Sequence, residues 1–404
     1  MKIVVLKFGG TSVGTIDRIK KVTDLIINYA KKKYKLIIVS SAMSGVTNDL
    51  VNKSKNISKN FSNAEYDSLV SSGEQVSCAL IAGRLIHKGY KSRSWMGWQV
   101  PIITDNKHKF AKINQVYKSR IIKYLKSGGI PVIAGFQGIN TEGRVTTIGR
   151  GGSDASAIIL AKIFKAKRCI IYTDVEGVYT IDPKKLKKAK KIRVISYEEM
   201  LEMASLGAKV MQPVSIQDAR LSRIDIEVKS SFKNKSGTLI TKRKNIINRN
   251  IITGISSTQN DAKVTLVGIK DKPGIAASIF KPLSESSINV DMVVQNISAN
   301  GKETDLTFTI KKDELNKTRK ITNLNKKIKF KKLLFDKNVS KVSIIGVGMI
   351  TTPGVTYRMF QALAKHKINI QVISTSEIKI SVLINKKNIS KAISALHKEF
   401  KLEI

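Results

Sequence analysis

Cysteine and histidine are scarce in this chain of 404 residues, which has two cysteines and four histidines. Cys78 and Cys169 each stand alone within an apolar stretch, which is typical of reduced core residues and argues against a disulfide framework. The histidines are scattered, and none has the spacing of zinc ligands. The sequence therefore predicts no disulfide-stabilised fold and no dedicated metal site.

Long apolar runs and leader features are also missing. No run approaches the roughly 20 apolar residues of a membrane-spanning helix. The chain enters an apolar segment at residues 3–6, without the basic start and small-residue cleavage site of a signal peptide. We therefore expect a cytoplasmic protein with no membrane partner. With 42% hydrophobic residues, a chain of this length can form two or three domains.

Acidic residues are few: 30 Asp and Glu stand against 72 Lys and Arg, giving a net charge of +42. One interpretation is a surface that binds nucleic acid; the other is a compositional bias on exposed faces. Lysine dominates, its densest runs lie at 31–35, 184–191 and 326–332, and no nucleic-acid motif accompanies them. The second interpretation is favoured, so we predict no nucleic-acid partner.

Strand and helix patterns alternate up to about residue 240. Short β-branched or apolar strands are expected at 3–6, 36–39, 131–134 and 169–172, and helices at 75–87 and 155–164. This alternation predicts an α/β fold, a three-layer αβα sandwich with a mainly parallel sheet. Ligands of such sheets bind beyond the carboxyl ends of the strands, where the glycine and acidic clusters of this chain fall.

The remainder of the chain contains a repeat. Residues 263–269 resemble 341–347, and each segment leads to Pro-Gly, a helix and a β-branched strand at the same offsets. A constant offset indicates a duplicated α+β unit. We expect three domains, at 1–245, 246–335 (with a junction strand) and 336–404.

The first strand ends in an unusual sequence, Lys7, Phe8, Gly9 and Gly10, followed by two hydroxyl residues. Paired glycines let backbone approach a ligand, and the helix expected near Thr15 aims its N-terminus at an anion. Phosphate binding is the functional interpretation. The alternative is an ordinary turn with a lysine at its edge.

Four more clusters contain polar residues at strand ends or helix starts. Ser41 and Thr47 follow the second strand, and Glu74 belongs to a Ser-Gly-Glu sequence that we expect to open a helix. A carboxylate there suits a substrate ammonium, although the helix dipole alone favours it. Arg150, Ser153 and Asp154 lie in a glycine-rich stretch, where a fixed guanidinium suits a carboxylate. The last cluster comprises Thr173, Asp174, Tyr179, Asp182 and Lys184, which could contact a nucleotide or form a plain Asp-Pro turn.

In their order along the chain, these clusters resemble the aspartokinases of the amino-acid kinase family. The matching motifs are at 7–12, 149–154, 172–179 and 203–210, and the paired C-terminal units resemble ferredoxin-like ACT domains. Glu176 stands where the family has Asp, and Lys184 where Arg is often found. The latter change loses a planar fork and weakens the expected nucleotide contact.

The resemblance implies phosphoryl transfer from ATP to the side-chain carboxylate of L-aspartate, the first step toward lysine, threonine, methionine and diaminopimelate. It implies that Lys7 stabilises the moving group and that Asp154 orients Lys7. It also implies that Arg150, Glu74, Thr47 and Ser153 bind aspartate, and that Mg²⁺ arrives with ATP rather than in a protein cage. The implied nucleotide-binding residues are Lys7, Phe8, Gly9, Gly10, Ser41, Thr173, Asp174, Tyr179, Asp182, Lys184 and Lys209.

The ACT pair implies feedback control by lysine, threonine or both, and a homodimer or larger assembly formed through these domains. The implied effector-binding residues are Asp271, Gly274, Asn289, Asp291, Gln295 and Asn296. Ordinary turn chemistry is the alternative for each. Three other functions stay open: a kinase for another acid or nucleotide, a non-catalytic amino-acid sensor, and a nucleic-acid binder.

Overall fold

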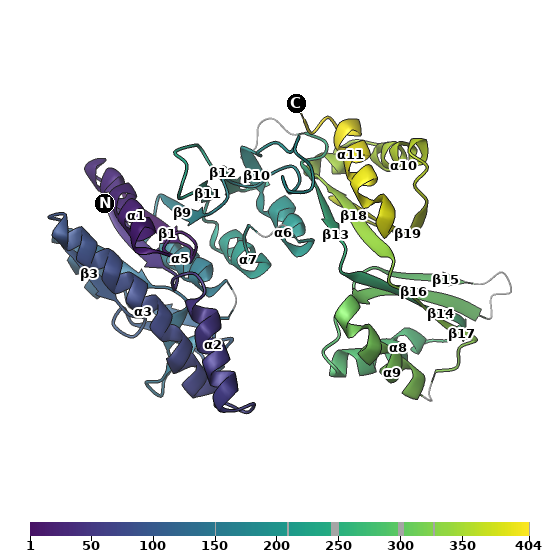
Figure 1. Cartoon of the computed structure of the whole chain (residues 1–404), viewed down its shortest axis with the longest axis horizontal. Helices are drawn as coiled ribbons and strands as arrows, with labels where there is room; N and C mark the ends of the chain where they lie inside the picture. Colours follow the sequence, from purple (N-terminus) through teal and green to yellow (C-terminus); the bar gives the residue numbers. More distant parts are fainter. Residues whose placement is uncertain (150, 208–209, 244–249, 298–302, 326–327, 404) are drawn as a thin grey trace. The chain divides into compact units, whose positions relative to one another are not determined.

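The computed structural model describes residues 1–149, 151–207, 210–243, 250–297, 303–325 and 328–403. The chain divides into two compact units (Figure 1). The first comprises Met1–Val178 and Lys191–Asn248, and the second comprises Tyr179–Lys190 and Arg249–Ile404. A short segment within the first half of the chain therefore belongs to the second unit.

The first unit is built on an eight-stranded sheet of order β10-β12-β11-β9-β1-β2-β6-β3. Its pairs are parallel except for β11 with β12. The strands are β1 (Ile3–Phe8), β2 (Lys35–Ser40), β3 (Ser92–Trp95), β6 (Ile130–Ala134), β9 (Arg168–Thr173), β10 (Val194–Ser196), β11 (Ile226–Ser230) and β12 (Thr238–Thr241). The carboxyl ends of β1, β2, β6 and β9 consequently meet at one edge.

Helices cover both faces of this sheet. Val4 and Leu6 of β1 share a buried cluster with residues of α1 and α3, while Lys7, pointing to the opposite face, reaches α5. The helices of this unit are α1 (Ile16–Lys31), α2 (Val46–Ile57), α3 (Asn63–His87), α4 (Ser119–Lys126), α5 (Gly152–Ile163), α6 (Tyr197–Ser205) and α7 (Pro213–Ser222). The predicted layers, with a mainly parallel sheet, are confirmed.

A second, four-stranded sheet of order β5-β4-β7-β8 extends from the same unit. Its strands are β4 (Ile102–Thr104), β5 (Ile113–Val116), β7 (Gln137–Ile139) and β8 (Val145–Thr147). The sequence pattern did not predict this sheet, because its strands are only three or four residues long. It brings residues 105–112 and 136 to the edge of the main sheet, beside the start of α5.

One predicted helix boundary is wrong. Ser72, Gly73 and Glu74 do not open a helix, because α3 already begins at Asn63. Gly73 interrupts the pattern for a packing reason: a Cβ at this position would lie 2.8 Å from the Cβ of Ala42. Glycine therefore allows α3 to approach the loop after β2 closely. Cys78 and Cys169 are free and buried, as predicted.

The second unit contains two four-stranded antiparallel sheets, of order β15-β16-β14-β17 and β13-β18-β20-β19. The strands are β13 (Gly254–Thr258), β14 (Asp261–Lys270), β15 (Val293–Ile297), β16 (Glu303–Lys311), β17 (Lys332–Asp336), β18 (Val339–Ile345), β19 (Ile370–Ser376) and β20 (Lys379–Asn385). The α-helices are α8 (Ile275–Glu285), α9 (Leu315–Leu324), α10 (Val355–Lys365) and α11 (Ile389–Glu399), and short 3-10 turns are at Lys312–Glu314, Val347–Thr351 and Lys386–Asn388. The duplicated α+β pattern is confirmed.

The strand that enters this unit, β13, pairs with β18 of the second sheet rather than with a strand of the first. Between the two sheets lies a small cluster of Met292, Val339, Val372 and Leu383. Within the described residues, no helix is both long enough and apolar enough to span a membrane.

Candidate active site

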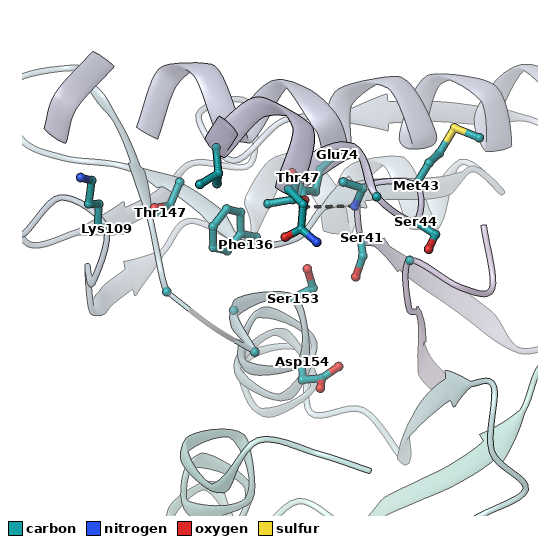
Figure 2. Close-up of a pocket in the computed structure, with 18 of the residues that line it drawn as sticks. Ser41, Met43, Ser44, Thr47, Glu74, Lys109, Phe136, Thr147, Ser153 and Asp154 are labelled. Carbon is teal, nitrogen blue, oxygen red and sulfur yellow. Dashed lines mark hydrogen bonds between the residues drawn. The ribbon is translucent and has the colours of Figure 1, made fainter. Parts of the chain in front are cut away.

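A cavity of about 770 Å³ opens in the first unit (Figure 2). The loop after β2, the middle of α3 and the start of α5 line it, together with residues near the small sheet. Of the residues predicted from the sequence, it brings together Lys7, Gly10, Ser41, Thr47, Glu74, Ser153 and Asp154. These residues come from four separate segments of the chain, so only the fold unites them.

Lys7 and Asp154 form an ion pair at this edge of the sheet. Lys7 Nζ lies 2.6 Å from Asp154 Oδ1, and the two side chains are only 10% and 12% exposed. Asp154 lies in the first turn of α5, where the helix dipole also favours a negative charge. The pair therefore fixes the ammonium of Lys7 in the cavity wall, where it can meet an anionic group.

The glycine turn after β1 is closely packed. The Gly9 N–H donates to Tyr172 O at 3.1 Å, and the Ser12 N–H donates to Gly9 O at 2.8 Å. A Cβ on Gly10 would lie 2.9 Å from Ala42 O, so this position requires glycine. Gly10 is the residue of the glycine pair that lines the cavity, whereas the Gly9 N–H is bonded to Tyr172 of β9.

Glu74 is a buried carboxylate in the middle of α3, 3% exposed. Its Oε1 accepts a hydrogen bond from the Ala42 N–H at 3.1 Å. Its Oε2 is buried without a hydrogen-bond partner among the described residues. Burial raises the pKa of Glu74 to about 7 from an ordinary 4.5, because desolvation of the carboxylate outweighs the Ala42 hydrogen bond. This oxygen can therefore accept a hydrogen bond from a cationic group of a ligand.

The start of α5, with Ser153 and Asp154, lies across the cavity from Glu74 (Figure 2). Gly151, at φ 77°, is the N-cap residue of α5. A Cβ on Gly151 would lie 2.7 Å from the Gln212 side chain, and one on Gly152 would lie 2.7 Å from the Phe136 ring. These glycines let the loop pack tightly and place Ser153 at the cavity. Arg150 lies outside the described residues.

The residues predicted for the nucleotide fall into two groups. Thr173 ends β9 in the first unit, and its hydroxyl donates to Asp174 Oδ1 at 3.0 Å. Tyr179, Asp182 and Lys184 belong to the segment that clusters with the second unit. There the Lys184 N–H donates to Asp182 Oδ1 at 2.9 Å in a turn. Lys209 lies outside the described residues.

The cavity also contains residues that the sequence did not single out: Tyr66, Lys109, Phe110, Phe136 and Thr147. Phe136 follows β6 with φ 67°, a left-handed conformation that is uncommon for a residue with a Cβ. The end of β6 was predicted, but no role was predicted for Phe136. Tyr66 lies on α3, whereas Lys109, Phe110 and Thr147 depend on the small sheet, for which the sequence carries no clear signal.

Comparison with known proteins agrees with this geometry. Residues 2–230 match the amino acid kinase family, and residues 264–323 and 342–400 match the ACT domain. The chain belongs to the amino acid kinase family. An aspartate kinase of Pseudomonas putida is 45% identical over 405 residues, covering 100% of this chain and 98% of that protein.

Two solved structures of Escherichia coli aspartokinase III are each 25% identical to this amino acid kinase. The R-state complex with aspartate and ADP has a TM-score of 0.78 and covers 98% of this chain and 99% of that one. The T-state complex with lysine and aspartate has a TM-score of 0.81 and covers 99% and 100%. The similarity therefore spans both units of the chain.

The first ACT domain of this amino acid kinase contains a second, smaller cavity of about 380 Å³ at the start of α8. It brings together Asp271, Gly274 and Gln295 of the predicted effector residues. Asn289 and Asn296 are exposed and do not line it. Asp291 instead forms an ion pair with the buried Lys341 of the second ACT domain.

Proposed function

We propose that this amino acid kinase transfers the γ-phosphoryl group of ATP to the side-chain carboxylate of L-aspartate, giving 4-phospho-L-aspartate and ADP. The observation that carries the proposal is the buried, unpartnered Oε2 of Glu74 in the cavity that also contains the Lys7–Asp154 pair. A carboxylate suits the ammonium of an amino acid, and a fixed lysine suits a phosphoryl group. A relative named aspartate kinase matches the chain over its full length.

The chemistry needs positioning and charge neutralisation more than it needs a base. The attacking carboxylate of aspartate is ionised at neutral pH, so no proton has to be removed. Lys7 stabilises the charge on the transferring group, and Gly10 lines the same cavity. Asp154 holds Lys7 in place. Thr47 and Ser153 contact the aspartate, and Arg150 binds its α-carboxylate.

The nucleotide enters as MgATP, with Mg²⁺ held by phosphate oxygens and water. In the part of the chain that the structure describes, no three His, Cys, Asp or Glu side chains form a metal-binding group. In this proposal Ser41, Thr173 and Asp174 contact the nucleotide from the first unit, together with Phe8 and Gly9. The contributions of Tyr179, Asp182, Lys184 and Lys209 are predictions from the sequence.

The ACT domains provide feedback control in this proposal, with lysine, threonine or both as the effector. Support comes from the cavity at Asp271, Gly274 and Gln295, and from the E. coli relative, whose T-state structure contains lysine. Roles for Asn289, Asp291 and Asn296, assembly through the ACT domains and a cytoplasmic location stay predictions. Titrating activity against lysine and threonine, singly and together, identifies the effector.

A coupled assay of ADP formation tests the activity and its acceptor. With MgATP, we expect ADP formation with L-aspartate and much less with L-glutamate, N-acetyl-L-aspartate or L-asparagine. N-acetyl-L-aspartate lacks the ammonium charge and carries a bulkier neutral amide in its place, so it tests the role of Glu74. Equal rates with and without the acetyl group would contradict that role, and activity with another acid alone would contradict the substrate.

A further inference from the structure

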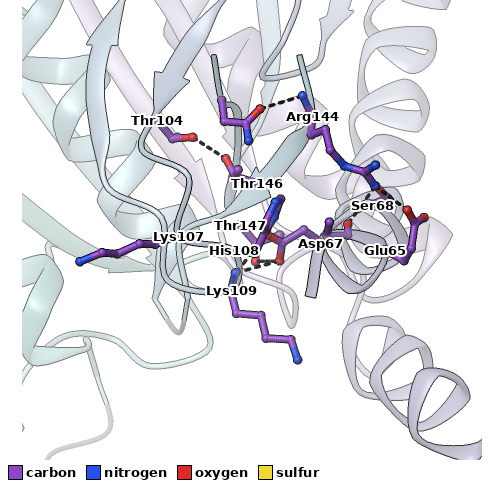
Figure 3. Close-up of polar contacts among 12 residues, drawn as sticks. Glu65, Asp67, Ser68, Thr104, Lys107, His108, Lys109, Arg144, Thr146 and Thr147 are labelled. Atoms are coloured by element: carbon purple, nitrogen blue, oxygen red, sulfur yellow. Dashed lines mark hydrogen bonds and ion pairs between the residues drawn. The ribbon is translucent and has the colours of Figure 1, made fainter. Parts of the chain in front are cut away.

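Asp67 is a second buried carboxylate on α3, and it is fully enclosed at 0% exposure. Three groups donate to it (Figure 3). His108 Nδ1 is 2.7 Å from Asp67 Oδ2, and the Thr147 hydroxyl is 2.5 Å from Oδ1. The Lys109 N–H lies 3.1 Å from Oδ1 and 3.0 Å from Oδ2. A buried carboxylate with this set of donors anchors other segments.

The donors belong to two segments that form the acceptor side of the cavity. His108 and Lys109 lie in the 105–112 loop between β4 and β5, and Thr147 ends β8 just before the glycine-rich loop. The Ala111 N–H also donates to Thr147 O, at 2.9 Å. Asp67 therefore joins α3, the 105–112 loop and the end of β8 at one point.

Lys109 has a strained backbone at this point. Its φ is 68°, in the left-handed region, which is unfavourable for a residue with a Cβ. The bifurcated hydrogen bond to Asp67 holds this conformation. It places the Lys109 ammonium 4.3 Å from the centre of the Tyr66 ring, and both residues line the cavity.

The strained loop packs against the glycine-rich loop. A Cβ on Gly149 would lie 3.1 Å from Lys109 O and 3.2 Å from the Phe110 ring. A shift of Lys109 therefore reaches the loop that leads to Ser153 and Asp154. Asp67 acts on the reacting groups only through these neighbours, since it does not line the cavity itself.

Asp67 and Glu74 have different roles on the same helix. They are seven residues apart, so two helical turns separate them on one face of α3. Glu74 keeps an oxygen without a partner, as a ligand-binding group does. Both oxygens of Asp67 accept hydrogen bonds from protein groups.

We propose that Asp67 is a positioning residue for the acceptor site: it holds Lys109 and Thr147 so that the loop at 105–112 and the glycine-rich loop form the wall that binds the amino-acid acceptor. The proposal deepens the function given above and rests on it. An acceptor wall is used equally in the ground state and the transition state, so its loss raises KM for the acceptor more than it lowers kcat.

Steady-state kinetics of Asp67→Asn tests the proposal. The asparagine amide keeps the shape of the Asp67 carboxylate, but its NH2 group faces groups that donated hydrogen bonds to Asp67. We expect KM for aspartate to rise by about tenfold or more, with kcat and KM for ATP changed by less than about threefold. Glu65→Gln is the matched control: it removes one charge from the same helix, but from an exposed ion pair with Arg144, and it should leave all three constants unchanged.

A second pair of variants keeps the test decisive if Asp67→Asn folds poorly. Thr147→Val removes one donor to Asp67 and should raise KM for aspartate, whereas Thr147→Ser keeps the hydroxyl and should restore it. Equal losses in Val and Ser, or a fall in kcat with unchanged KM, would overturn the positioning role.

Hydrogen exchange separates this proposal from the proposed function. In Asp67→Asn, amide exchange should accelerate in residues 105–112 and at 147, and it should not do so in Glu65→Gln. Faster exchange without any aspartate-dependent activity in the parent would refute the proposed function but not the positioning role of Asp67. Unchanged exchange would refute that positioning role whatever the activity.

Discussion

The affinity for aspartate should depend on pH, because binding of the aspartate ammonium requires the carboxylate of Glu74 to be ionised. Burial raises the pKa of Glu74 to about 7 in the ligand-free protein. Below this pH the residue is protonated and offers no charge to the ammonium of aspartate. Binding must then release one proton, so affinity falls as the pH decreases.

The magnitude follows from the ionised fraction. With a pKa of about 7, Glu74 is about one-tenth ionised at pH 6 and about nine-tenths ionised at pH 8, so affinity should rise roughly tenfold over this interval. The aspartate side chain and ammonium do not titrate between these pH values. Aspartate itself therefore adds no slope.

Calorimetric titration with aspartate alone is the assay, because the phosphate of ATP would titrate in the same range. Repeating it in buffers with different ionisation enthalpies counts the protons released, which should approach one at pH 6 and none at pH 8. Glu74→Gln should bind weakly with no pH slope. A flat affinity in the parent, or the same slope in Glu74→Gln, would refute the reasoning.

Three further outcomes are expected. The same raised pKa means that Glu74 contributes to the stability of the folded state only at low pH: this contribution is complete below about pH 4.5 and is lost as the pH rises through about 7. At pH 8 the free energy of unfolding of Glu74→Gln should therefore exceed that of the parent by up to about 3 kcal/mol, with a higher urea midpoint. Equal midpoints at pH 8 would contradict this. Lys7→Met should lower kcat by about 10²-fold or more while the protein stays folded, because it removes the charge held by Asp154; an unchanged kcat in the ADP assay would refute the role. Asp291→Asn leaves the buried Lys341 without its partner and should destabilise the ACT pair by about 1–3 kcal/mol in urea unfolding, whereas Lys341→Met should cost less; the opposite ranking would show that the ion pair does not matter.

The Lys7–Asp154 pair shows what the sequence and its family resemblance predict well. Sequence patterns placed each residue at a junction, one after a buried strand and the other before an apolar helix. The resemblance implied that Asp154 orients Lys7, and in the structure the two side chains form an ion pair where the end of β1 meets the start of α5. Glu74 was also singled out, although it was predicted to lie at the start of a helix, because Gly73 resembles a helix boundary. In the structure it lies in the middle of α3.

The network around Asp67 shows what the sequence does not predict. Its partners are 41, 42 and 80 residues away and lie in a loop and a three-residue strand without periodicity. The left-handed conformations of Lys109 and Phe136 are set by tertiary contacts and not by residue type. Such positions can be found only once the small sheet is placed beside the cavity.

Trapping the product tests the central claim most directly. Hydroxylamine converts an acyl phosphate into a hydroxamate, so the protein incubated with MgATP, L-aspartate and hydroxylamine should form the β-hydroxamate of aspartate in step with ADP. Lys7→Met should reduce both together. ADP formation without hydroxamate, or hydroxamate from glutamate and not from aspartate, would contradict the assignment of the cavity to an aspartate side-chain carboxylate.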